Sequence, residues 1–251
     1  MWIFSQLFIK SYTLVFRLID VFLLLPKRLG RLLKHLGRGL RLIGLKPKVW
    51  EDEIGGSWYH RLGLWWMALM VYVLDCLGVG EIYETISAVF KYNTRPLHPW
   101  EIEMARTIYD DNINYKRVRI DDLSMVGPKQ GRFCYVSFYL VNSWGEMRNS
   151  TLIHELMHVW QYERYGALYM VQAIRAQNTA LAYDYGGLEK LKAYLAVGKK
   201  LKDFNPEQQA DIITDYFLIK NGNAPPWGCA GQEDLSIYEK FIEDLDKGKK
   251  S

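Results

Sequence analysis

Residues 151–161 read Thr-Leu-Ile-His-Glu-Leu-Met-His-Val-Trp-Gln and contain the pattern His-Glu-x-x-His. On a helix, residues four apart lie on one face, so His154 and His158 can present their imidazole nitrogens to one cation. Glu155 follows the first histidine and can reach a water on that cation. This arrangement is typical of a zinc-dependent peptidase in which Glu155 is the general base. Because the pattern also occurs on ordinary amphipathic helices, a third ligand is needed.

The candidate for that third ligand lies in residues 205–211, which read Asn-Pro-Glu-Gln-Gln-Ala-Asp. Asn at the N-cap followed by Pro at the first helical position predicts a helix that starts at Asn205. Glu207 would complete a set of two histidines and one carboxylate and leave the fourth zinc position for water. Asp211, one turn further on, can accept the free ring N–H of a ligating histidine, which we expect to be His154. An isolated Glu-x-x-x-Asp pair is more often a solvated helix face, but its place downstream of the first motif favours a metal site.

The two motifs together, His-Glu-Leu-x-His at 154–158 and Glu-x-x-x-Asp at 207–211, resemble the gluzincin zinc peptidases, the thermolysin-like group. Residues 207–211 are also similar to the membrane-bound CAAX prenyl endopeptidases. Residues 151–161 more closely resemble a bacterial metallopeptidase-like domain that occurs alone and in secretion-system or toxin-associated proteins. This resemblance covers about residues 97–220. It implies a zincin-like fold, a Zn²⁺ cofactor and a protein or peptide substrate.

Two comparisons within the zinc peptidases refine the expected site. The metzincin family is excluded, because the positions where it needs Gly and His hold Gln161 and Arg164. Gluzincins usually add a His or Tyr that stabilises the oxyanion. Tyr183, Tyr185 and Tyr216 are candidates for this role, and the sequence assigns none of them.

The domain that carries these motifs is expected to be α+β. Pro96-Leu97-His98-Pro99 signals a boundary, which divides the chain into a helical region at 1–96 and a metallopeptidase domain at 97–251. Periodicity predicts a helix at 100–109, strands at 115–120 and 132–141, and a turn at 127–131. The motif helix should end near Gly166, and residues 167–197 should be largely helical with a break at Gly186-Gly187. We therefore expect a mostly helical, zincin-like domain with a small β-sheet, whose strand at 132–141 could pair with an extended substrate.

The basic charge of the chain is concentrated at its beginning. The net charge is +4, but residues 1–50 carry ten Lys/Arg against the single acid Asp20, which leaves −5 for the remainder. Residues 2–25 are apolar but lack the positive start and the cleavage site of a signal peptide. The segment is expected to be an amphipathic helix, kinked or broken at Pro26. Its polar stripe consists of Gln6, Lys10, Thr13, Arg17, Asp20, Lys27, Arg31, Lys34, Arg38 and Arg41.

This pattern favours a helix in the interface of an anionic membrane, although packing on its own domain or on a protein partner remains open. Nucleic acid is excluded as a partner, because the opposite face is too apolar and no binding motif accompanies the charge. A second apolar run at 62–80 either spans the bilayer, with Asp75 near one end, or inserts as a hairpin. The expected location is the inner membrane, peripheral or single-pass. The alternative is a secreted effector.

The sequence therefore predicts a zinc metallopeptidase that associates with a membrane through its N-terminal region. Two alternatives stay open. The protein could be non-catalytic, with a structural or vestigial zinc site, or it could be a translocated effector in which residues 1–96 serve delivery. Three scattered cysteines exclude a thiolate zinc site but leave a disulfide between Cys134 and Cys229 open.

Overall fold

The structure is a computed structural model that describes residues 2–42, 58–91, 93–125, 127–131, 133–177, 183–227 and 229–246. The chain divides between Tyr92 and Asn93 into two compact units, and Gly166–Leu168 group with the first. The sequence placed this boundary slightly later, between residues 96 and 97. Two predicted segments, the first residue of the strand at 132–141 and the helical stretch at 178–182, lie outside the described residues.

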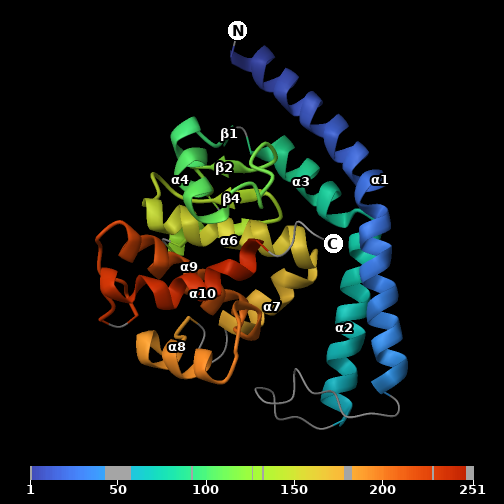
Figure 1. The fold of residues 1–251 in the computed structure, drawn as a ribbon. Coiled ribbons are helices and arrows are strands. Elements are labelled where there is room, and N and C mark those ends of the chain that lie inside the picture. The colour runs from blue at the N-terminus through green and yellow to red at the C-terminus, as the bar shows by residue number, and fades with distance from the viewer. Residues whose placement is uncertain are drawn as a thin grey trace. The chain divides into compact units, whose positions relative to one another are not determined.

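Helices dominate both units, and the strands are short (Figure 1). The N-terminal unit contains α1 (Trp2–Leu42), α2 (Trp58–Cys76) and α3 (Val79–Phe90). The helices of the second unit are α4 (Pro99–Tyr109), α5 (Pro128–Gly131), α6 (Asn149–Tyr165), α7 (Leu168–Gln177), α8 (Gly187–Ala196), α9 (Pro206–Lys220) and α10 (Leu235–Asp246), with 3-10 turns at Leu201–Asp203 and Gln232–Asp234. Its strands are β1 (Thr94–Pro96), β2 (Arg119–Asp121), β3 (Tyr135–Ser137) and β4 (Leu140–Asn142).

In the N-terminal unit, α1 packs against α2 and α3. Of the kink or break expected at Pro26, the break is absent, because α1 continues through this residue, and Figure 1 shows one helix with a bend near its middle. Pro26 lacks the N–H that would bond to the carbonyl of Phe22, and such a loss bends a helix without having to end it. A turn at Leu77-Gly78 separates α2 from α3, and Gly78 has the left-handed φ of 69° that favours glycine there.

Within the described residues, no single helix combines the length and the apolar composition that crossing a membrane requires. Leu62–Cys76 and Val79–Ala88 meet both requirements only as a pair, and the two helices are bent by 63°. The apolar run predicted at 62–80 is therefore not a straight helix, since the turn interrupts it close to Asp75.

The sheet of the second unit has the order β1-β2-β4-β3, with β2 and β4 parallel and the two outer pairs antiparallel. Two strand predictions were partly wrong. The strand expected at 115–120 begins only at Arg119, because Tyr115–Arg117 form a turn. The strand expected at 132–141 is a hairpin, in which Phe138 adopts a φ of 60° between β3 and β4. The turn residues Phe138 and Tyr139 are aromatic, and aromatic residues are common in strands. The sequence pattern therefore could not distinguish this turn from a continuous strand.

Helix α6 lies between the sheet and α9, and α10 packs on α9 (Figure 1). Its interior positions are fully buried, among them Ile153, Leu156 and Met157. The hydroxyl of Tyr109 on α4 donates to the carbonyl oxygen of Ile153 at 2.6 Å, which ties α4 to α6. The predicted α+β class, mostly helical with a small sheet, is confirmed.

Candidate metal centre

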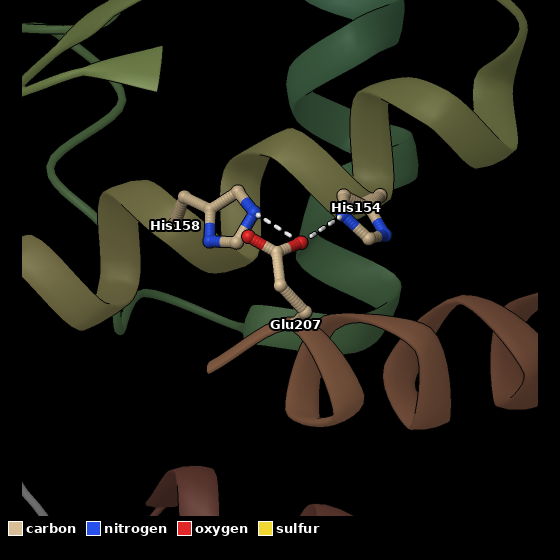
Figure 2. Close-up of side chains that lie close together, drawn as sticks. All are labelled: His154, His158 and Glu207. Carbon is tan, nitrogen blue, oxygen red and sulfur yellow. Dashed lines mark ion pairs between the residues drawn. The ribbon is translucent and has the colours of Figure 1, made fainter. Parts of the chain in front are cut away.

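Helices α6 and α9 bring His154, His158 and Glu207 to one point (Figure 2). Glu207 Oε2 lies 3.4 Å from His154 Nε2 and 3.5 Å from His158 Nε2. Ligands of a tetrahedral zinc ion, each roughly 2.0–2.2 Å from the metal, lie about 3.3–3.6 Å apart, so these distances suit such an ion. In the part of the chain that the structure describes, these three residues form the one group of His, Cys, Asp and Glu whose ligand atoms lie within 4.8 Å of one another.

The local sequence explains why Glu207 reaches this point. The side chain of Asn205 accepts a hydrogen bond from the backbone N–H of Gln208 at 2.9 Å, and Pro206 occupies the first turn of α9. This capping fixes where α9 begins and therefore which residue of its first turn faces α6. Most residues of α9 are buried, so the helix cannot rotate about its axis without unpacking the core.

His154 is oriented by a carboxylate. Its Nδ1 lies 2.9 Å from Asp211 Oδ1, and Asp211 Oδ2 accepts a hydrogen bond from the indole N–H of Trp227 at 2.7 Å. A proton on Nδ1 of His154 leaves the lone pair of Nε2 free to face Glu207. The sequence had paired Asp211 with His154, and the structure places these two side chains in contact.

His158 is oriented by an amide. Its Nδ1 lies 2.9 Å from Gln161 Oε1, and Gln161 Nε2 donates to the carbonyl of Pro206 at 2.9 Å and to Gln209 Oε1 at 3.0 Å. Because the amide nitrogen of Gln161 is committed to these two acceptors, its oxygen must accept from His158. This arrangement again leaves the lone pair of Nε2 free.

The carboxylate of Glu207 has two different environments. Its Oε1 accepts a hydrogen bond from Gln177 Nε2 at 2.9 Å, whereas its Oε2 is buried without a hydrogen bond and faces both histidines. A buried carboxylate oxygen without a donor is costly unless a cation lies beside it. The residues present therefore fit a zinc ion, with His154, His158 and Glu207 as its ligands and one position left open.

The surroundings of the site are strongly anionic. With neutral imidazoles, Glu155, Glu207 and Asp211 give three negative charges, which a divalent cation would largely balance. Burial disfavours charge on His154, but the carboxylates of Asp211 and Glu207 outweigh this effect and raise the pKa of His154 to about 10. Burial likewise opposes ionisation of Glu207, but the two imidazoles hold its pKa well below the usual range.

Glu155 is 5% exposed, and its Oε2 accepts no hydrogen bond. Burial raises its pKa above the ordinary value for a glutamate, although both imidazoles act in the opposite direction. A carboxylate that is neither paired nor freely solvated is a stronger base than one on the surface.

The three tyrosines named as oxyanion candidates lie in different places. The ring of Tyr183 lies 6.4 Å from that of His154, and its side chain is 38% exposed. Tyr185 is buried and donates its hydroxyl to Asp215, and Tyr216 is buried in the hydrophobic core. Of these three, only Tyr183 is both at the site and accessible.

The sheet edge expected to pair with substrate is β3. The carbonyl oxygen of Val136 in this strand accepts a hydrogen bond from the hydroxyl of Tyr169 at 3.2 Å, so this edge position is occupied. The ring of Tyr169 in turn stacks with that of His158 at 6.2 Å. Addition of a substrate strand therefore has less room than the sequence suggested.

Three residues that orient the site were not predicted from the sequence. Gln161 was noted only because it excludes the metzincins, although its position one turn after His158 could have identified it as a hydrogen-bond partner. Gln177 and Trp227 carried no such signal, because each reaches the site from a separate segment. The three cysteines are free thiols, so the disulfide left open between Cys134 and Cys229 is absent.

Comparison with known proteins shows a partial likeness to one component of a secretion system. The chain is 35% identical over 140 residues to the type VI secretion system spike protein VgrG2b of Pseudomonas aeruginosa. The match covers 51% of this chain but only 13% of that protein. No protein-family model matches the chain, and no solved structure matches it.

Proposed function

We propose that this chain is a zinc-dependent metallopeptidase of the gluzincin type. The observation that carries the proposal is the convergence of His154 Nε2, His158 Nε2 and Glu207 Oε2 within 4.8 Å, with the second ring nitrogen of each histidine already committed. Structural zinc sites usually have four protein ligands and catalytic sites have three. The three-ligand group within the described residues therefore favours catalysis over a purely structural zinc.

Zinc held by these ligands would polarise the scissile carbonyl and make the attacking water more acidic. Glu155 takes the proton from that water and delivers it to the leaving amine nitrogen. Asp211 and Gln161 keep the imidazoles in the tautomer that ligation needs, and Tyr183, a partly exposed residue beside His154, is the candidate donor to the developing oxyanion.

The test compares the metal content of the full chain, purified without chelator, with its cleavage of a peptide library. We expect about one zinc per chain and cleavage that a chelator abolishes. Glu155→Gln should retain the zinc and lose about 10²–10⁴-fold in rate, because it removes only proton transfer. Glu207→Gln should lose the zinc as well.

The rival proposal is a non-catalytic protein with a structural or vestigial site. A chain without stoichiometric zinc, or a Glu155→Gln variant as active as the original, would reject the peptidase proposal. Stoichiometric zinc with no cleavage of any library peptide would favour the rival.

We also propose that the protein acts in a secretion-system setting and associates with a membrane through its N-terminal region. The likeness of half the chain to a segment of a type VI secretion system spike protein supports the first part. Immunodetection of the tagged chain in cell membranes and in culture medium, with and without a working secretion apparatus, tests both parts. Recovery only from the cytosol in both strains would contradict them.

A further inference from the structure

The N-terminal unit keeps charged side chains in its interior. Arg28 is 2% exposed and Asp75 is 5% exposed, and Arg28 Nε lies 3.5 Å from Asp75 Oδ1. Arg31 Nη1 lies 3.2 Å from Asp75 Oδ2, and Arg28 also pairs with Glu81. These ion pairs join α1 to both α2 and α3. The sequence had assigned Arg31 to a stripe that meets lipid headgroups, but the structure turns it toward Asp75.

The same unit presents apolar side chains on its outside. Among the residues whose side chains the structure describes, it contributes 16 of the 25 exposed large apolar ones, although the other unit is the larger of the two. They follow helical spacing, so each helix has one exposed apolar stripe. The stripes consist of Val15, Ile19, Phe22, Leu23, Leu29 and Leu33 on α1, Leu62, Trp66, Met70 and Leu74 on α2, Leu77 in the turn, and Val79, Ile82, Tyr83, Ile86 and Phe90 on α3.

This distribution is the reverse of what water favours. Buried ion pairs lose hydration that their mutual attraction does not fully replace, and exposed apolar area forfeits the hydrophobic gain. Single exposed apolar residues are ordinary, but contiguous stripes on three helices are not. In hydrocarbon the exposed apolar stripes are no longer unfavourable, because lipid solvates them. Charged side chains are then most stable when they are paired inside the protein.

The exposed charges of the unit identify the kind of bilayer. Lys34 and Arg38 on α1 are exposed. Among the described residues of the unit no acid is exposed, since Asp75, Glu81 and Glu84 are buried and Asp20 is half-buried. The accessible charge is therefore basic, which complements an anionic lipid headgroup.

We propose that α1, α2 and α3 insert together into an anionic lipid bilayer, with the three apolar stripes in the hydrocarbon and the arginine–carboxylate pairs inside the unit. The bend of 63° between α2 and α3 suits a re-entrant insertion, since neither helix qualifies as a span by itself. The inserted face is the apolar one, and Lys34 and Arg38 contact the headgroups. This inference rests on the membrane association proposed above, which it makes specific, and it is independent of the proposed peptidase activity.

The experiment is flotation of the full chain with vesicles of phosphatidylglycerol and phosphatidylcholine, or of phosphatidylcholine alone. We expect the chain to float, and more of it with the anionic vesicles. Leu23→Glu combined with Ile82→Glu should reduce the bound fraction at least about tenfold, because it places charge in hydrocarbon. Lys34→Glu combined with Arg38→Glu should lower binding to anionic vesicles by about 25-fold or more, because each basic residue that is lost costs about fivefold in affinity. Binding to phosphatidylcholine alone should not change.

The matched control is Val197→Glu, at an apolar residue of the second unit that is 73% exposed, against 68% for Leu23 and 55% for Ile82. This variant should float like the original chain. Circular dichroism of each variant verifies that the helices persist. The proposal is overturned if the original chain stays at the bottom of both gradients. It is also overturned if the chain forms dimers in buffer that Leu23→Glu with Ile82→Glu dissolves, since a second copy would then cover the stripes, or if Val197→Glu weakens flotation equally.

Discussion

The two histidines of the candidate centre are held by acceptors of different charge. His154 meets the carboxylate of Asp211, whereas His158 meets the amide of Gln161. A carboxylate makes its imidazole a stronger metal ligand than an amide does, and it also adds a negative charge beside the metal. The two contacts should therefore contribute unequally to metal affinity.

Asp211→Asn is expected to weaken zinc binding about 10–100-fold. The asparagine keeps the size of the side chain but removes the charge that supports His154. Competition against a fluorescent zinc chelator measures the change, with the exposed Asp111→Asn as a control that should bind like the original chain. An unchanged affinity in Asp211→Asn would show that Asp211 does not support a metal ligand.

Asp215 is a second residue whose environment has a measurable consequence. It is 1% exposed, and it accepts a hydrogen bond from Tyr185, whose hydroxyl also lies 3.0 Å from that of Tyr238. Burial raises the pKa of Asp215 to about 7, although the Tyr185 hydroxyl acts in the opposite direction. The folded chain therefore binds this proton more tightly than the unfolded chain does.

The sign of the pH dependence follows from that difference. The stabilisation from protonated Asp215 is complete below about pH 4 and is lost as the pH rises to about 7, with about 4 kcal/mol as an upper bound. Asp215→Asn removes this contribution to the pH dependence. Urea unfolding at pH 5 and pH 8 should show a smaller loss of stability in the variant than in the original chain. Equal losses would mean that Asp215 ionises normally in the fold.

At the scale of elements, Arg28 joins three helices. It is fully buried on α1 and pairs with Asp75 on α2 and with Glu81 on α3. No helix of this unit can contribute these charges alone, so their pairing requires all three to be packed. The ion pairs therefore determine which faces of α1, α2 and α3 pack together. Because the charged faces point inward, the apolar stripes face outward.

Arg28→Leu should destabilise the N-terminal unit by about 3–5 kcal/mol, because it removes the buried Arg28 charge from Glu81 and leaves Asp75 paired with Arg31 alone. Hydrogen exchange of the full chain should become faster in α1, α2 and α3, while α6 and α9 keep their protection. Arg28→Lys, which retains the charge, should lose less stability than Arg28→Leu. If Arg28→Leu is as protected as the original chain, the buried pairs do not hold the unit together.

At the scale of the whole molecule, the two units have different chemistry. The N-terminal unit is basic and apolar on its outside, and the second unit carries the anionic centre in its interior. The strong positive charge of residues 1–50 and the net negative charge of the rest already separate these regions in the sequence. Each unit has its own packing, so its candidate function can be tested without changing the other.

Sequence alone determined what depends on neighbouring residues. The spacing of His154 and His158 and the capping of α9 are local properties, and both persist in the fold. The α+β class could also be predicted from the sequence, because long helical periods and short aromatic runs are visible without tertiary contacts. The hairpin at Phe138 could not, because it depends on a positive φ that the residue type does not signal.

Only the tertiary structure decided which faces meet. It brought Gln177 and Trp227 to the ligands from distant segments, and it turned Arg28 and Arg31 inward to carboxylates more than 40 residues away. Helical periodicity shows that a face exists, but it does not show what covers that face, because the partner is chosen by packing and charge across the whole chain.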